Sequence, residues 1–137
     1  MQIVRSLVID CHIEDVFAYV ADPLNDPAWC PTVLVVDQVD GDGPGPGARY
    51  EMLRRPIPWR PARPTACTCV DWDPPGRIAW RCEAAGDLVR VSYALEPVWT
   101  ATRLTLREEP RRRALRLSTA RDVERRLRAL RARLERA

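Results

Sequence analysis

Lysine is absent from this sequence of 137 residues, and histidine and phenylalanine each occur once. All 22 basic residues are therefore arginine, which, beside abundant alanine and 13 prolines, indicates the codon bias of a GC-rich genome. Histidine is the commonest general acid or base in enzymes. The single histidine, His12, lies between a predicted strand and a predicted helix, where a surface loop residue is expected. No Ser-His or Cys-His catalytic arrangement is supported.

Long hydrophobic runs are also missing, so the sequence predicts no membrane insertion. Arg5 and Asp10 interrupt the apolar N-terminus, which argues against a secretory signal. The five cysteines are Cys11, Cys30, Cys67, Cys69 and Cys82. Their odd number and irregular spacing, without a secretory signal, indicate reduced thiols in a cytoplasmic protein.

No metal or other cofactor is expected. Cys67 and Cys69 would face the same side of a strand, but a zinc site needs a second pair of ligands, which the sequence does not offer. The glycine-rich segment GDGPGPG at 41–47 resembles a phosphate-binding loop only superficially, because no Gly-Lys-Ser/Thr and no helix follow it.

The composition is that of an ordinary globular protein, with 46% hydrophobic and 30% charged residues, and we expect one domain over residues 1–137. Residues 107–137 hold 12 arginines against 5 acids. A basic segment of this kind can bind phosphates or acidic lipid, but the solvated face of an amphipathic helix explains it better. A nucleic-acid partner is therefore not predicted.

The N-terminal half alternates strands with short helices. Residues 2–10 are predicted to form a strand, and the apolar spacing over 13–21 predicts a helix that Asp22-Pro23 ends. One short helical turn is expected near Trp29. Further strands are predicted at 32–39 and 49–54, followed by a stiff, proline-rich loop over 55–64.

Four further strands are predicted at 65–72, 77–83, 88–96 and 102–108. The short turns between them indicate antiparallel neighbours. The residues sort by period two into an apolar face (Ile78, Trp80, Cys82; Val89, Val91, Tyr93, Leu95; Leu104, Leu106) and a largely charged face (Arg81, Glu83, Arg90, Glu96, Arg103, Arg107).

The strongest pattern is C-terminal. Apolar residues recur every three or four positions among arginines, at Leu117, Ala120, Val123, Leu127, Leu130 and Leu134. This predicts a helix of about 20–25 residues, with Pro110 near a first turn. A long helix with one apolar face needs a sheet to cover it. The predicted fold class is therefore α+β: a curved antiparallel sheet of about seven strands around a long C-terminal helix, with one or two short helices after the first strand.

Several stretches resemble a known family: VIDCHIEDVFAYVADPLNDPAWCP (8–31), GARYEM (47–52), VDWDPPGRIAWR (70–81), VSYALEP (91–97) and TRLTLREE (102–109). Together they resemble the polyketide cyclase/dehydrase branch of the SRPBCC superfamily, which has the START-like, helix-grip fold. The resemblance covers nearly the whole chain except the 55–64 loop and residues 110–120. The segment Val98-Trp99-Thr100-Ala101 departs from it, because relatives often carry a glycine-rich hairpin there.

The resemblance implies a cavity between the C-terminal helix and the sheet that receives a hydrophobic small molecule. Some members of this branch cyclise, aromatise or dehydrate polyketide-like substrates in secondary metabolism, whereas others carry lipids or hormones without chemistry. Two hypotheses therefore stand, an enzyme or a non-catalytic carrier. The oligomeric state, a homodimer included, is left open.

The candidate catalytic residues are Arg54 and Tyr93. If Tyr50 faces inward, Arg54 on the same face of its strand could polarise a carbonyl or hold a carboxylate, although a solvated charge at the strand end is an alternative. Tyr93 is equally compatible with plain core packing. The candidate ligand-binding residues are Trp29, Tyr50, Met52, Trp59, Trp80, Cys82, Val91, Val123, Leu127 and Leu130.

Overall fold

The computed structural model describes residues 2–55, 58–110 and 119–136. Strand β1 (Ile3–Ile9) leads into helix α1 (Ile13–Val20), a short 3-10 turn η1 (Pro23–Asn25) and the single-turn helix α2 (Asp26–Trp29). Six strands follow, and the chain then forms a C-terminal helix: β2 (Val33–Asp40), β3 (Arg49–Arg54), β4 (Arg63–Asp73), β5 (Arg77–Ala84), β6 (Asp87–Val98), β7 (Ala101–Pro110) and α3 (Ala120–Glu135).

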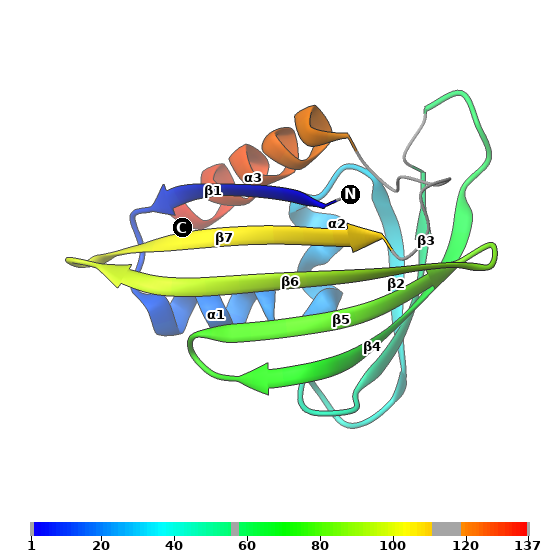
Figure 1. Ribbon diagram of the computed structural model, residues 1–137, viewed down its shortest axis with the longest axis horizontal. Coiled ribbons are helices and arrows are strands. Elements are labelled where there is room, and N and C mark those ends of the chain that lie inside the picture. Colours follow the sequence, from blue (N-terminus) through cyan, green and yellow to red (C-terminus); the bar gives the residue numbers. More distant parts are fainter. Residues whose placement is uncertain (1, 56–57, 111–118, 137) are drawn as a thin grey trace.

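The seven strands form one antiparallel sheet in the order β1-β7-β6-β5-β4-β3-β2 (Figure 1). Strands β2 to β7 each pair with the next strand in sequence. Strand β1 pairs with β7, so β1 and β2 form the two edges of the sheet. Helix α3 packs against β1 and α2. The predicted α+β class, with its curved sheet and C-terminal helix, is confirmed.

Period two in the sequence corresponds closely to burial in the sheet. Ile78, Trp80 and Cys82 of β5 are at most 6% exposed, whereas their neighbours Arg81 and Glu83 are exposed. One face of the sheet is therefore dry and packs on the helices. Apolar residues of α1, α2 and α3 belong to the same core cluster as the inward residues of the strands.

Two tight turns connect β5, β6 and β7. Ala85 and Gly86 join β5 to β6 with φ angles of 51° and 84°, the positive pair that suits a two-residue hairpin. At the next hairpin Trp99 also has a positive φ, 57°, and its side chain is 97% exposed. Trp99 therefore lies at the tip of a hairpin, outside the core.

The C-terminal helix is shorter than predicted. It spans 16 residues, and Thr119 caps its N-terminus in a capping box with Asp122. The expectation that Pro110 lies near the first turn of the helix was wrong, because β7 extends to Pro110. Leu117 lies outside the described residues.

The proline-rich loop is also shorter than predicted, since β4 begins at Arg63. Pro64 lies inside this strand opposite Leu53 of β3. The ladder from β4 to β5 starts only at Ala66, so Pro64 has a strand partner on one side, and a proline, which lacks a backbone N–H, is tolerated there. None of the described helices is long and apolar enough to cross a membrane.

Candidate ligand-binding site

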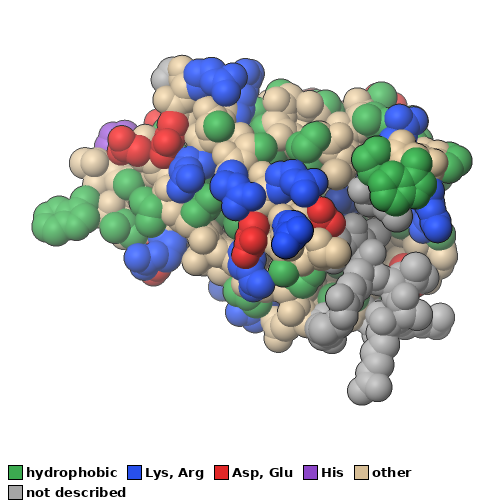
Figure 2. All heavy atoms as spheres, turned by 90° about the horizontal axis from the view of Figure 1, so that it is seen from above, with side chains coloured by type: hydrophobic (Ala, Val, Ile, Leu, Met, Phe, Trp, Pro, Cys, Tyr) green, Lys and Arg blue, Asp and Glu red, His purple; other side chains and the backbone are tan. Residues whose placement is uncertain are grey.

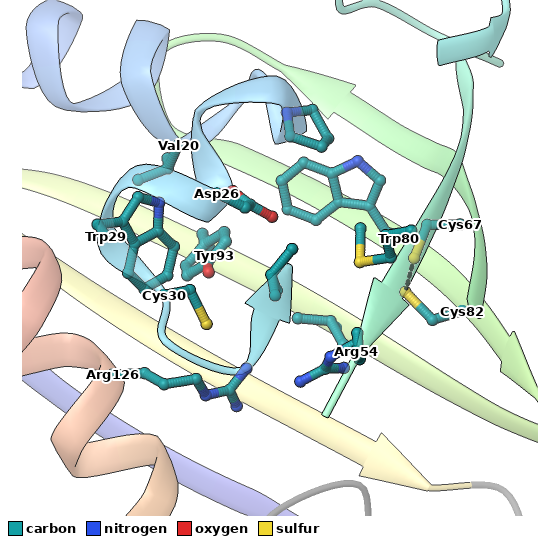
Figure 3. Close-up of a pocket in the computed structure, with 14 residues that line it drawn as sticks. Val20, Asp26, Trp29, Cys30, Arg54, Cys67, Trp80, Cys82, Tyr93 and Arg126 are labelled. Atoms are coloured by element: carbon teal, nitrogen blue, oxygen red, sulfur yellow. Dashed lines mark hydrogen bonds between the residues drawn. The ribbon is translucent and has the colours of Figure 1, made fainter. Parts of the chain in front are cut away.

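A cavity of about 60 Å³ lies between the helices and the dry face of the sheet (Figure 3). The segment from α1 to the start of β2 contributes Val20, Pro23, Asp26, Trp29, Cys30 and Val33. The remaining wall comes from strands β3 to β6 and from α3: Met52, Arg54, Cys67, Trp80, Cys82, Val91, Tyr93 and Arg126. Two more open hollows of about 430 and 360 Å³ exist, but exposed residues such as Arg81, Arg90 and Glu83 line them. The cavity between the helices and the sheet is therefore the candidate site.

Arg54 is the charged group that the sheet contributes to this cavity. It follows Tyr50 and Met52 on the inward face of β3 and is only 6% exposed, so the alternative of a solvated strand-end charge was wrong. Its Nε has no hydrogen-bond partner, and Arg54 forms no ion pair within the described part of the chain. A buried charge is costly unless it is paired. The guanidinium is thus available to an oxygen atom of a ligand.

Arg126 of α3 is the second guanidinium at the cavity. It forms an ion pair with Glu108 of β7, and both side chains are almost fully buried, at 9% and 4% exposure. Burial lowers the pKa of Arg126, but the attraction of Glu108, the hydrogen bond to it and the smaller effects of Cys30 and Tyr93 together outweigh burial, and the net shift is upward. The pair therefore holds α3 on the sheet with Arg126 charged.

Asp26, at the start of α2, is the acidic residue that lines the cavity. Its carboxyl group points inward, toward the space between Tyr93 and Trp80 (Figure 3). Burial raises the pKa of Asp26 from 3.8 to about 7, while the charges of Arg54 and Arg126 pull it down. Asp26 can therefore gain and lose a proton near neutral pH.

Tyr93 of β6 lies beneath this carboxyl group. It is 7% exposed and packs edge-on against Trp80, with ring centroids 5.7 Å apart at 84°. Burial and the nearby charge of Asp26 raise the pKa of Tyr93, so its hydroxyl group stays protonated and can donate a hydrogen bond.

Two thiols form part of the opposite wall. Cys67 and Cys82 face each other in the β4–β5 ladder, and their sulfur atoms are 2.6 Å apart. The contact with Cys67 and then burial raise the pKa of Cys82 well above its ordinary value. A protonated buried thiol is a small apolar group and a poor nucleophile.

The structure brings seven of the twelve predicted site residues together at the cavity: Arg54, Tyr93, Trp29, Met52, Trp80, Cys82 and Val91. Tyr50 is buried in the same region but does not line the cavity, and burial raises its pKa to about 12. Trp59 is 84% exposed and does not line the cavity. Three residues of α3 are buried in the core without lining the cavity: Val123, Leu127 and Leu130.

Sequence reasoning missed seven lining residues: Val20, Pro23, Asp26, Cys30, Val33, Cys67 and Arg126. The segment around Asp26 contains prolines at 23, 27 and 31, so it offers no periodicity from which an inward side chain can be predicted. The position of Arg126, in contrast, could have been predicted from the helical pattern. It is three residues after Val123 and directly before Leu127, which places it on the apolar stripe of the helix.

His12 is exposed and precedes the first residue of α1, away from the cavity. Among the residues that the structure describes, no cluster of three or more His, Cys, Asp or Glu side chains is placed to hold a metal ion. The charged and hydroxyl-bearing side chains that line the cavity are Arg54, Asp26, Tyr93 and Arg126.

A curved antiparallel sheet closed by a C-terminal helix, with an internal cavity that holds a few polar groups, defines a START-like protein. The sequence matches the family described as "Polyketide cyclase / dehydrase and lipid transport" over residues 1–136, and the chain belongs to this family. None of the curated proteins matches it.

Solved structures with the same fold include the Zhui aromatase/cyclase from Streptomyces sp. R1128, at 16% identity, TM-score 0.81 and coverage of 99% of this chain and 94% of the other. A START superfamily protein from Mycobacterium smegmatis has 12% identity, TM-score 0.80 and coverage of 98% and 97%. A protein from Chromobacterium violaceum has 19% identity, TM-score 0.80 and coverage of 98% of both chains. At these identities the likeness concerns the fold.

Proposed function

We propose that this protein binds a compact, hydrophobic small molecule in the cavity, with an oxygen-bearing end of that molecule on Arg54. The buried Arg54 guanidinium, without an ion pair among the described residues, is the observation that carries the proposal. Apolar and aromatic walls with a few polar groups are typical of small-molecule sites. Family membership also supports a hydrophobic ligand.

The size of the cavity limits the ligand. Pockets for drug-sized molecules measure roughly 300–1,000 Å³, whereas this cavity measures about 60 Å³. A molecule of one ring, or one end of a longer molecule, fits this space better than a multi-ring polyketide. A larger substrate would require the cavity to open.

A second candidate function is catalysis of cyclisation or dehydration on a polyketide-like ketone, and Asp26 favours it. In this scheme ionised Asp26 removes a proton from the carbon beside a carbonyl, and Arg54 stabilises the enolate oxygen that forms. The enolate carbon attacks a second carbonyl of the same molecule, and protonated Asp26 returns its proton to the new alkoxide. In the same scheme the hydroxyl group of Tyr93, which also lines the cavity, donates a hydrogen bond to one of these oxygens.

Binding of small, flat aromatic probes tests the proposal. Four compounds suffice: naphthalene, 2-naphthol, benzamide and benzoate. We expect at least one of them to raise the melting temperature, because a ligand that binds only the folded state stabilises it. It should also quench tryptophan fluorescence in a Trp59→Phe/Trp99→Phe background, which removes the two exposed tryptophans and keeps Trp29 and Trp80 at the cavity. Failure of all four compounds at millimolar concentration would refute the proposal.

Arg54→Gln separates the two candidate functions. If the protein is an enzyme, the substitution lowers turnover of a poly-β-ketone substrate far more than it lowers affinity, because the guanidinium acts mainly on the charge of the transition state. If the protein is a carrier, it changes affinity only. Arg49→Gln is the matched control, since Arg49 lies on the same strand with its side chain exposed.

A further inference from the structure

The charges at the cavity are arranged for competition over one guanidinium. Arg126 is held by Glu108, which does not itself line the cavity. Arg54 forms no ion pair in the described ranges, and Asp26 is the single acid among the lining residues. Any acidic group that enters the cavity therefore shares Arg54 with the carboxyl group of Asp26.

The charged groups that act on Asp26 come from three different segments of the chain. Asp22 lies just before η1, Arg54 comes from β3, and Arg126 comes from α3. The charge of Asp26 in turn contributes to the raised pKa values of Tyr93 in β6 and Tyr50 in β3. The two arginines favour the ionised carboxylate, while burial and Asp22 favour the protonated acid. Because these effects oppose one another, one further charge in the cavity can change whether the carboxyl group of Asp26 is protonated.

A second negative charge in this space would decide where the proton goes. Two carboxylates that share a site cannot both remain ionised at little cost, so one of them takes up a proton. Asp26 is the group with a pKa near 7, whereas a free aromatic carboxylate has a pKa near 4, close to that of an ordinary Glu side chain. The ligand then keeps its charge on Arg54, and Asp26 becomes neutral and can donate a hydrogen bond to it.

The walls specify the rest of the ligand. Trp80 and Tyr93 present aromatic surfaces and Met52 an adaptable apolar one. The volume of about 60 Å³ leaves room for one ring rather than several. With a single available guanidinium, one acidic group is matched and a second would remain unpaired.

We propose that the cavity binds a compact aromatic monocarboxylate through Arg54, and that Asp26 takes up a proton as this anion enters. This inference rests on the proposed binding function and names its ligand class and its pH dependence. Binding is then coupled to pH: the anion binds tightly in mildly acidic solution and is released as the pH rises above neutrality.

Calorimetric titration with benzoate and with benzamide, its neutral analogue of similar size, tests this inference on the full chain. At pH 7.5, titrations in phosphate and in Tris measure the number of protons taken up, because the two buffers differ in ionisation enthalpy. We expect the protein to take up more than about half a proton for each benzoate bound, and the affinity for benzoate to fall up to about tenfold per pH unit above pH 7. Benzamide should show a much smaller uptake.

Two substitutions assign the coupling to residues. Asp26→Asn should abolish both the proton uptake that accompanies benzoate binding and the pH dependence of the affinity, whereas Asp37→Asn, at an exposed position of β2, should change neither. Arg54→Gln should weaken benzoate binding by about 10- to 100-fold and benzamide binding by a much smaller factor, since only benzoate loses an ion pair with the guanidinium. Arg49→Gln should bind both compounds like the wild type.

The outcomes are distinct. Benzoate binding without proton uptake in the wild-type protein would overturn the coupling while leaving the binding function intact, and this result depends on no variant. Equal binding of benzoate and benzamide at every pH would overturn the monocarboxylate class. If neither compound binds, and naphthalene and 2-naphthol also fail, the proposed function itself is wrong.

Discussion

Replacing Asp26 by asparagine should stabilise the protein in alkaline solution and leave its stability almost unchanged in acid. Folding raises the pKa of Asp26 from 3.8 to about 7, mainly through burial. Between these two values the unfolded chain binds fewer protons at Asp26 than the folded chain does, so the free energy of unfolding falls as the pH rises. The two pKa values differ by about three units, and each unit is equivalent to about 1.4 kcal/mol. The ionised carboxyl group of Asp26 therefore lowers the free energy of unfolding by about 4 kcal/mol in alkaline solution. Asparagine has a similar shape and carries no charge, and it avoids this cost.

Urea unfolding at pH 4, 5.5, 7 and 8 measures the effect. The stability advantage of Asp26→Asn over the wild type should grow from near zero at pH 4 to about 4 kcal/mol at pH 8. Asp37→Asn removes an exposed carboxylate and should follow the wild-type profile at every pH. Parallel profiles for Asp26→Asn and the wild type would refute the reasoning, because they would mean that folding does not change the proton affinity of Asp26.

Three further predictions concern the packing around the cavity. Glu108→Gln should cost about 3–5 kcal/mol in chemical denaturation, because it removes the negative charge from a buried ion pair with Arg126, and adding Arg126→Met should recover most of that loss. A full loss in the double variant would contradict this. Leu130→Ala should lower the free energy of unfolding by about 2–5 kcal/mol, because Leu130 is fully buried. Arg128→Ala, on the exposed side of α3, should stay within about 0.5 kcal/mol of the wild type. Equal effects of the two substitutions would show that α3 does not pack on the sheet. Trp80→Ala should cost about 3–5 kcal/mol and weaken the binding of flat probes in the fluorescence assay, so unchanged affinity would place the probe elsewhere.

The fold was predictable because its signals are local and repeated. Alternation along β5 and β6 specified which residues face the core, and the apolar spacing of the last segment specified one face of α3. The ends of elements were less predictable. Pro110 can begin a helix or end a strand, and only its position opposite Val89 in the β6–β7 ladder decides between the two.

The cavity was predictable in part, for a physical reason. A strand pattern shows which face Arg54 shares with Tyr50, but the last residue of a strand can extend into solvent or lie beneath another element. Arg54 is buried in a cavity wall to which α2 and α3 also contribute, and the strand pattern alone does not reveal those helices. Asp26 was missed because its orientation depends on how a proline-rich segment turns over the sheet, which no periodicity records.

Intermolecular NOEs between a bound probe and the protein test most directly whether this cavity is the binding site. With uniformly ¹³C,¹⁵N-labelled protein and unlabelled benzoate or 2-naphthol at saturation, the ring protons of the probe should show NOEs to Met52, Trp80 and Tyr93. For benzoate, the Arg54 guanidinium resonances should also shift. NOEs confined to the exposed Trp59 or Trp99, with the Arg54 signals unmoved, would contradict a binding site between the sheet and the helices. Contacts confined to exposed residues, such as the arginine and acidic side chains interspersed on the face of the molecule in Figure 2, would contradict it as well.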